Sequence, residues 1–255
     1  MITRLILSAF CVALFFSSPA VANATGRVVL RENVSRPHRE QLLNKLRKIT
    51  GWTRLTFAND GTLSFDSTET SKGSRSARSL LASAINGNTV IILEDASSRV
   101  DVAFCRVVPG RWIKNNIAGL SVYVILIDFT DFEQITGDEA AREAFDVGWG
   151  VLHEVDHVVM NSADTEVDGH VGECEDHINK MRAELGLPLR ASYFFTSSAL
   201  RSDPNFNTRF VRLPFEQRDE SSRRLKRYWL AWDFNVVGGL ASPLNRVARS
   251  SADIF

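Results

Sequence analysis

The segment TGDEAAREAFDVGWGVLHEVDHVVMN, residues 136–161, constrains the fold more than any other part of the chain. Its apolar residues recur at spacings of three and four, which is the period of an amphipathic α-helix. Thr136 and Glu139 match a capping box at the start of such a helix. We therefore predict one long helix here, which must bury its apolar stripe against another layer of the protein. The stripe consists of Phe145, Trp149, Leu152, Val155 and Val159.

Other periodic segments predict the elements around this helix. Amphipathic spacing predicts further helices over residues 37–49, 76–85 and 172–185. Runs of β-branched and aromatic residues predict strands over 89–95, 102–108 and 121–129, and the sequence Asn59-Asp60-Gly61 predicts a hairpin. The pattern weakens beyond Pro188, where residues 208–215 and 225–232 fit either strands or short helices.

The N-terminus has the layout of a secretory signal peptide. Arg4 precedes an apolar run over residues 5–16, and small residues follow at Ala20, Ala22 and Ala24. We predict cleavage after Ala22 or Ala24, so that residues 1–24 are the signal peptide and the mature protein is soluble and secreted or periplasmic. No later run approaches the roughly 18 apolar residues of a membrane span, so we expect no membrane anchor after cleavage.

The composition bounds the class of protein and its partners. Lys+Arg 30 balances Asp+Glu 30, so no global charge draws the chain to nucleic acid or anionic lipid. Residues 25–255 can bury one core, and we predict a single domain with a less regular part after about residue 194. Cys105 and Cys174 remain after processing, and the sequence leaves open whether they form a disulfide or stay buried thiols.

The motif HEVDH, residues 153–157, lies in the C-terminal half of the predicted long helix. His153 and His157 project from one helix face with Cβ atoms roughly 5–6 Å apart, so they can share one metal ion. A tetrahedral zinc ion accepts such a pair and leaves room for a third protein ligand and a water. Glu154 flanks the same face and can act as the general base toward that water. Because four of the five histidines fall in one short window, we favour a metal site over a chance match on a helix face.

The third ligand can come from either of two places. Asn161 tolerates the left-handed conformation that ends a helix, and such a turn can bring Asp164 to the metal. Glu175 lies on a polar stripe of the following helix and can also face the site, or it is a carboxylate outside the ligand set, paired with Arg182. We prefer Asp164, with other acidic residues between 164 and 176 left open. Two further histidines are expected outside the ligand set, His170 and His177.

Residues 148–193 resemble the zincin-type metallopeptidase domain of bacterial effector proteins and of the ends of some Rhs-type toxins. In that family His-Glu-x-x-His is followed by a Gly, an Asp, and a helix that ends in Arg-x-Glu-Leu-Gly-Leu-Pro, with a later Arg and Tyr. The matching residues after the motif are Arg182, Glu184, Leu185, Gly186, Leu187, Pro188, Arg190 and Tyr193. Asn161 stands where the family has Gly, and this chain has a predicted signal peptide and no Rhs repeat.

The resemblance implies a role for five residues. It implies that His153, His157 and Asp164 bind zinc, that Glu154 is the base, and that Tyr193 lies near the metal. A phenol in that place could complete the coordination or donate to the oxyanion of a tetrahedral intermediate. From the residues alone, Tyr193 is better explained as a core tyrosine with its hydroxyl at the surface.

These patterns together predict an α+β, zincin-like metallopeptidase domain, with a small twisted sheet, an active-site helix and a second helix packed below it. The strand over 121–129 is a candidate edge for an extended substrate, although a buried core strand explains its sequence equally well. The leading function is a zinc metallopeptidase that hydrolyses peptide bonds of a polypeptide substrate. The alternatives are a catalytically inactive metal-binding protein on a peptidase-like fold, or a zinc hydrolase of a non-peptide or cell-wall amide.

Overall fold

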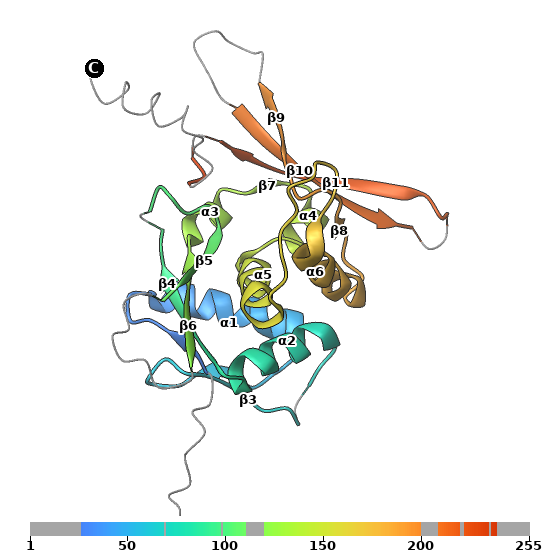
Figure 1. Ribbon diagram of the computed structural model, residues 1–255. Helices are drawn as coiled ribbons and strands as arrows, with labels where there is room; N and C mark the ends of the chain where they lie inside the picture. Colours follow the sequence, from blue (N-terminus) through green and yellow to red (C-terminus); the bar gives the residue numbers. More distant parts are fainter. Residues whose placement is uncertain are drawn as a thin grey trace, which may run out of the picture.

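The structure is a computed structural model that describes residues 27–68, 70–97, 99–110, 120–199, 209–219, 222–234 and 236–238. Helices and small sheets both occur along these residues, so the protein has the mixed α and β composition that the sequence predicts (Figure 1). The predicted signal peptide, residues 1–24, lies outside the described part. Within the described part, no helix combines the length and the apolar character needed to cross a membrane.

One sheet has the strand order β1-β4-β6-β5. β1 (Arg27–Leu30), β4 (Thr89–Asp95) and β6 (Ser121–Ile127) pair in parallel, and β5 (Cys105–Pro109) runs antiparallel to β6. The interpretation of residues 121–129 as a substrate-binding edge is therefore wrong, because β4 and β5 occupy both sides of β6. The alternative interpretation, a buried core strand, is correct. β5 forms one edge of this sheet and β1 forms the other.

The predicted hairpin is formed by β2 (Leu55–Phe57) and β3 (Leu63–Phe65). Gly61 in its turn has φ 81°. A Cβ at this position would lie 2.3 Å from the carbonyl oxygen of Leu30. Glycine is therefore required both for the backbone conformation and for the close approach of the turn to β1.

Helix α5 (Val147–Met160) is the element around which the main core is built (Figure 1). It contacts α1 (Arg36–Thr50), α2 (Arg75–Asn86) and α6 (Gly172–Glu184), as well as β5 and β6. The structure therefore confirms the three shorter helices that the sequence predicts, which are α1, α2 and α6. The largest hydrophobic cluster joins them through side chains that include Leu46, Leu81, Leu152 and Ile178.

The predicted single helix over 136–161 is wrong, because the chain breaks it into three elements. β7 (Thr136–Gly137) pairs with the C-terminal sheet, α4 (Glu139–Glu143) follows, and α5 begins after Asp146. The Asp146 carboxylate accepts hydrogen bonds from the backbone N–H groups of Gly148 and Trp149, which makes it a strong N-cap at this point. The Thr136 hydroxyl donates to the carbonyl of Ala231 instead of capping a helix.

The C-terminal part is more regular than the sequence predicts. A second sheet has the order β7-β11-β10-β8, with β9 (Thr196–Ala199) also paired to β10. β10 (Arg209–Arg218) and β11 (Leu225–Asp233) form a long antiparallel hairpin, and β8 (Leu189–Arg190) pairs with β10. Both segments that fitted strands or short helices are strands. A second hydrophobic cluster, which includes Phe215, Leu230 and Trp232, packs under this sheet.

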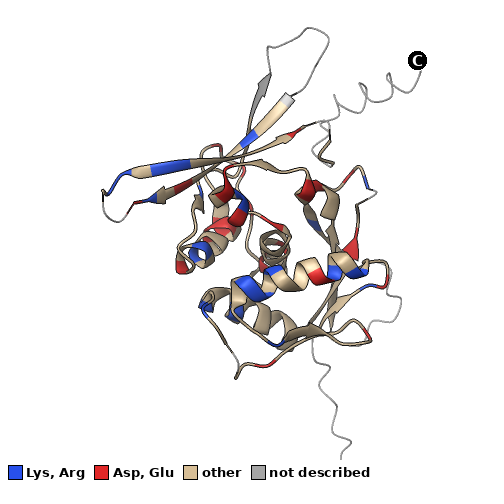
Figure 2. Ribbon diagram, turned by 180° about the vertical axis from the view of Figure 1, so that it is seen from behind, with Lys and Arg blue, Asp and Glu red and all other residues tan. Residues whose placement is uncertain are grey.

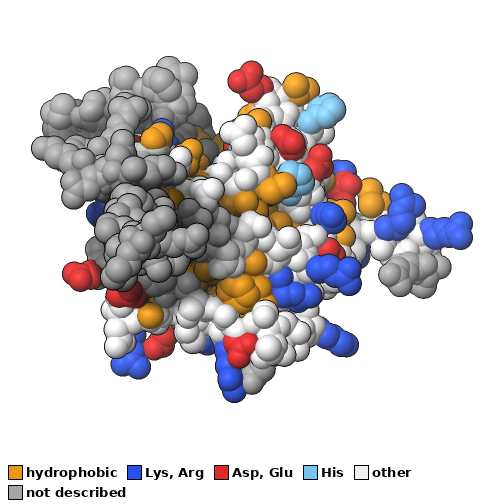
Figure 3. Space-filling view, turned by 60° about the horizontal axis from the view of Figure 1, so that its bottom comes forward, with side chains coloured by type: hydrophobic (Ala, Val, Ile, Leu, Met, Phe, Trp, Pro, Cys, Tyr) orange, Lys and Arg blue, Asp and Glu red, His pale blue; other side chains and the backbone are white. Residues whose placement is uncertain are grey.

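The far end of the β10–β11 hairpin projects from the rest of the protein and carries Lys and Arg residues (Figures 2 and 3). They include the exposed side chains of Arg218, Arg224 and Lys226, together with Arg227, which pairs with Glu216. The balanced net charge of the chain is therefore unevenly distributed over its surface.

Candidate metal centre

Helix α5 brings the two histidines of the HEVDH motif together as predicted. Nε2 of His153 lies 3.2 Å from Nε2 of His157. The helix ends at Asn161, which takes the predicted left-handed conformation with φ 55°. This turn reverses the chain after the helix and leads it back past the histidine side chains.

Asp164 lies at the imidazole nitrogens that face each other. Its Oδ1 is 3.3 Å from Nε2 of His153, and its Oδ2 is 3.4 Å from Nε2 of His157. Burial opposes ionisation of Asp164, but the two histidines hold the pKa of this carboxyl well below its usual range. The same contacts, with a contribution from Cys174, raise the pKa of His157 to about 11. Together with Cys174, these three residues form a cluster that could hold a metal ion.

The hydrogen bonds at Nδ1 determine which histidine nitrogens are free. Nδ1 of His157 lies 2.9 Å from the carbonyl oxygen of Ser162, and Nδ1 of His153 lies 3.2 Å from Oε2 of Glu175. Carbonyl and carboxylate oxygens only accept hydrogen bonds, so Nδ1 carries the proton in both rings. Each Nε2 therefore directs a lone pair into the space beside Asp164 when the ring is neutral.

Glu175, the rival candidate for third ligand, lies on the other side of the His153 ring from Asp164. Its side chain is 1% exposed and its carboxylate receives hydrogen bonds from the guanidinium groups of Arg182 and Arg190. Burial opposes its ionisation, but these two cations keep the pKa of Glu175 well below its usual range. The carboxylate therefore orients His153 and does not face the Nε2 atoms.

Cys174 is a candidate ligand that the sequence did not suggest. Its Sγ lies 3.4 Å from Nδ1 of His153 and 3.4 Å from the carbonyl oxygen of the same residue. Cys174 is separated from His153 by 21 residues, so the sequence does not show that the two are close in the fold. Cys105 and Cys174 are both free thiols in the structure, so the disulfide that the sequence left open is not formed.

Glu154 points from α5 toward β5, and it lines the same cavity as His153. Its side chain is buried, and its Oε2 accepts a hydrogen bond of 2.8 Å from the backbone N–H of Val107 in β5. Burial raises the pKa of Glu154, although the nearby histidines oppose the shift. A raised pKa favours a carboxylate that can take up a proton near neutral pH.

Tyr193 lies beside Asp164 in the candidate cluster, and the resemblance implies a position near the metal for this residue. Its hydroxyl donates a hydrogen bond of 2.6 Å to Oδ2 of Asp164. Its ring faces that of His153 and packs under the guanidinium of Arg190, with Cζ 4.8 Å from the ring centroid. Burial and the Asp164 carboxylate raise the pKa of Tyr193, so the phenol keeps its proton at neutral pH.

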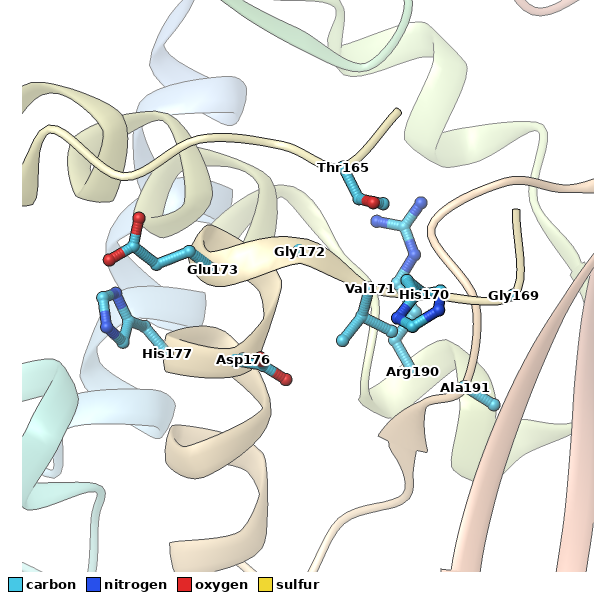
Figure 4. Close-up of a pocket in the computed structure, with 10 residues that line it drawn as sticks. All are labelled: Thr165, Gly169, His170, Val171, Gly172, Glu173, Asp176, His177, Arg190 and Ala191. Carbon is cyan, nitrogen blue, oxygen red and sulfur yellow. The ribbon is translucent and has the colours of Figure 1, made fainter. Parts of the chain in front are cut away.

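The other two histidines near the motif, His170 and His177, lie outside this group of donors. His170 is exposed, and Nδ1 of His177 lies 2.9 Å from Oδ2 of the buried Asp156. Both line a shallow depression of about 670 Å³. Figure 4 shows Glu173, Asp176 and His177 on α6, with His170 on the segment that leads into this helix. Oδ2 of Asp156 also accepts a hydrogen bond from the Ser162 hydroxyl, at 2.6 Å.

Comparisons of the chain with known protein families, with curated proteins and with solved structures found no match.

Proposed function

We propose that the protein is an exported zinc metallopeptidase with a zincin-like fold. One observation carries the proposal. The Nε2 atoms of His153 and His157 and the carboxylate of Asp164 lie 3.2–3.4 Å from one another, with the lone pairs of all three groups directed into the same space. Two lone pairs that face each other at this distance repel, unless a cation lies between them and the carboxylate. A shared proton or a metal ion meets that requirement, and metal binding displaces such a proton.

Zinc fits the spacing of these donors. It binds nitrogen and oxygen ligands at about 2.0–2.2 Å, so neighbouring ligands of a tetrahedral ion lie about 3.3–3.6 Å apart. The separations of 3.2 Å between the two Nε2 atoms, and of 3.3 and 3.4 Å from them to the two oxygens of Asp164, lie close to that tetrahedral edge. Three protein ligands with a fourth position for water are typical of catalytic zinc sites.

The surroundings of the donors supply the remaining groups for peptide hydrolysis. When bound, zinc would supply a water of lowered pKa and polarise the scissile carbonyl. Glu154 would accept a proton from the attacking water and pass it to the departing amide nitrogen, so that the products are a carboxylate and an amine. The Tyr193 hydroxyl keeps its proton and can turn from Asp164 to donate to the developing oxyanion. The chain would leave the cytoplasm by its predicted signal peptide.

One observation favours a second candidate, a metal-binding protein without turnover. The Cys174 thiol belongs to the same cluster of donors, and four protein ligands would close the site. Its Sγ lies 3.4 Å from Nδ1 of His153, the ring nitrogen that does not face Asp164, and this argues for the three-ligand arrangement. A Cys174→Ser variant separates the two, because a three-ligand site keeps zinc and a four-ligand site loses affinity by orders of magnitude.

The first test combines zinc content with hydrolysis. We expect about one zinc per chain in purified residues 25–255, reduced in His157→Ala and in Asp164→Asn, with Asp168→Asn as an exposed control. Glu154→Gln should keep its zinc and lose cleavage of a casein and peptide panel, whereas the exposed Glu173→Gln should keep both. A protein that binds no zinc after reconstitution would remove the proposal. If the protein binds zinc and cleaves only peptidoglycan or ester substrates, it is a zinc hydrolase of another class and not a peptidase.

A further inference from the structure

A cavity of about 430 Å³ adjoins the candidate metal centre. Its lining residues come from the segment at the start of β5, from α5 and α6, and from the C-terminal part of the chain. His153 and Glu154 form part of the wall, so an occupant of the cavity lies beside the groups proposed to act on the substrate. Tyr193 and Phe194 also line it, and Phe194 is 38% exposed, which places this side of the cavity at the protein surface.

Seven Phe, Trp and Tyr residues contribute their aromatic rings to the wall. Phe104 contacts both Phe145 and Trp232 edge to face, with ring centroids 5.2 Å apart in each pair. The other aromatic residues of the wall are Trp149, Tyr193, Phe194 and Phe195. Rings arranged edge to face present further faces and edges to an entering ring, so this wall favours an aromatic occupant over a small one.

The charged groups of the wall are already paired. Glu175 binds the guanidinium groups of Arg182 and Arg190, and these cations also donate to the backbone carbonyls of Ala144, Ser192 and Tyr193. Glu154, the other carboxylate of the wall, accepts a hydrogen bond from the backbone N–H of Val107. A charged side chain that entered would lose its hydration without gaining a free counter-charge from this group. The cavity therefore selects against acidic and basic side chains.

Trp232 adds a polar requirement. It is 2% exposed, and among the described residues its indole Nε1–H is the buried side-chain group without a hydrogen-bond partner. Such unpaired donors are rare in folded proteins and call for a partner. Because Trp232 lines the cavity, a ligand that brings an acceptor oxygen on an aromatic ring can supply that partner. Tyrosine carries this oxygen and phenylalanine lacks it.

We infer that this cavity binds an aromatic side chain of the polypeptide next to the scissile bond, with tyrosine favoured over phenylalanine. The inference rests on the proposed peptidase function for the position of the bond. Recognition of the side chain itself depends only on the cavity.

Binding by a protein that cannot hydrolyse the ligand tests the cavity. The zinc-loaded Glu154→Gln protein is titrated with the N-acetyl amides of tyrosine, phenylalanine and alanine, followed by ligand-observed NMR. Burial of an aromatic ring predicts binding about 10-fold or more tighter for phenylalanine than for alanine. Ala103→Leu adds volume to the wall and should remove most of this difference. Ala58→Leu, at an exposed position near β2, is the matched control and should change nothing.

The tyrosine preference has its own variant. Trp232→Phe keeps an aromatic wall and deletes the Nε1–H, so it should bring the tyrosine and phenylalanine amides to equal affinity. Equal affinity already in the protein with Trp232 would overturn the preference. Equal affinity of phenylalanine and alanine amides, or no effect of Ala103→Leu, would overturn the aromatic pocket.

Cleavage of a peptide series in the wild-type protein then separates this inference from the proposed function. Hydrolysis of peptides without preference for an aromatic residue beside the cleaved bond would support the peptidase function and contradict the proposed specificity of the cavity. Preferential binding of the aromatic amides without hydrolysis of any peptide would support the specificity of the cavity and contradict the peptidase function. Preferential cleavage beside tyrosine, lowered about 10-fold by Ala103→Leu and unaltered by Ala58→Leu, is the expected result.

Discussion

Oε2 of Glu175 lies 3.2 Å from Nδ1 of His153, so a buried carboxylate of α6 holds the ring whose Nε2 faces Asp164. The same carboxylate is bound by Arg182 and Arg190, and the Arg182 guanidinium lies over the ring of Trp149, 5.2 Å from its centroid. Glu175 therefore links the orientation of a candidate metal ligand to the packing of α5 against α6.

Replacing Glu175 should affect both metal binding and stability. In Glu175→Gln the acceptor that fixes the His153 tautomer is weakened, and we expect zinc affinity to fall about 10- to 100-fold. Arg182 is 1% exposed and would lose its counter-charge, so the free energy of unfolding should fall by about 3–5 kcal/mol. Competition with a zinc indicator and urea unfolding measure the two effects. The exposed Glu173→Gln is the control, and an equal response of both variants would contradict the assigned role.

Ser162 holds the other histidine through the backbone. Its hydroxyl donates to the buried Asp156, and its carbonyl accepts from Nδ1 of His157. Ser162→Ala removes the bond to Asp156, and we expect a loss of about 1.5–3 kcal/mol in unfolding free energy. Zinc affinity should also fall, because the carbonyl that positions His157 is less firmly held. The exposed Ser83→Ala in α2 should leave zinc affinity unchanged in the same titration. If Ser162→Ala binds zinc as tightly as the wild type, Ser162 has no role in positioning His157 for zinc binding.

Metal removal should lower stability through mass action. A ligand that binds only the folded protein stabilises it by about 4 kcal/mol when its free concentration is 1,000 times Kd. We expect EDTA to lower the urea midpoint of the wild-type protein and of Asp168→Asn. Asp164→Asn should already have a low midpoint that EDTA hardly changes. A wild-type midpoint indifferent to EDTA would argue against a stably bound metal.

Glu184 predicts an acid-sensitive step away from the metal. Burial opposes its ionisation, but hydrogen bonds from the Ser74 hydroxyl and from the N–H and hydroxyl of Ser76 lower the pKa of Glu184 to about 2. A carboxyl with a lowered folded-state pKa stabilises the protein above its unfolded pKa, and this contribution is lost as pH falls toward the folded value. Stability should therefore decline between pH about 4.5 and about 2.

The variant Glu184→Gln should flatten part of that decline. Glu166→Gln, at an exposed position, is the control and should leave the slope unchanged. Urea unfolding of the three proteins at pH 5, 4 and 3 makes the comparison. The same slope in Glu184→Gln as in the wild type would show that the contact of α6 with the start of α2 does not depend on this charge.

Local sequence determined most of the helices and strands, and it also determined the grouping of His153, His157 and Asp164 in the candidate site. Period and spacing located α1, α2, α6 and the strand β4, because amphipathic repeats report which residues can be buried together. The pairing of His153 with His157 followed from helix geometry alone. The left-handed Asn161, which brings Asp164 back to them, followed from the backbone preference of that residue.

Tertiary structure decided what depends on partners distant in the sequence. The long helix is broken because Asp146 caps α5 and β7 pairs with β11, and hydrophobic periodicity registers neither contact. β6 became an inner strand because β5 pairs on its far side.

The same reason separates the two carboxylates that competed for the third ligand position. Asp164 and Glu175 have the same chemistry, and both could reach a histidine in the sequence. Only the packing of α6 against α5 places Glu175 at Nδ1 of His153, between two arginines, and leaves Nε2 to Asp164. The aromatic cavity is likewise built from segments 103–105, 145–154, 193–195 and the C-terminal strands, which meet only in the folded chain.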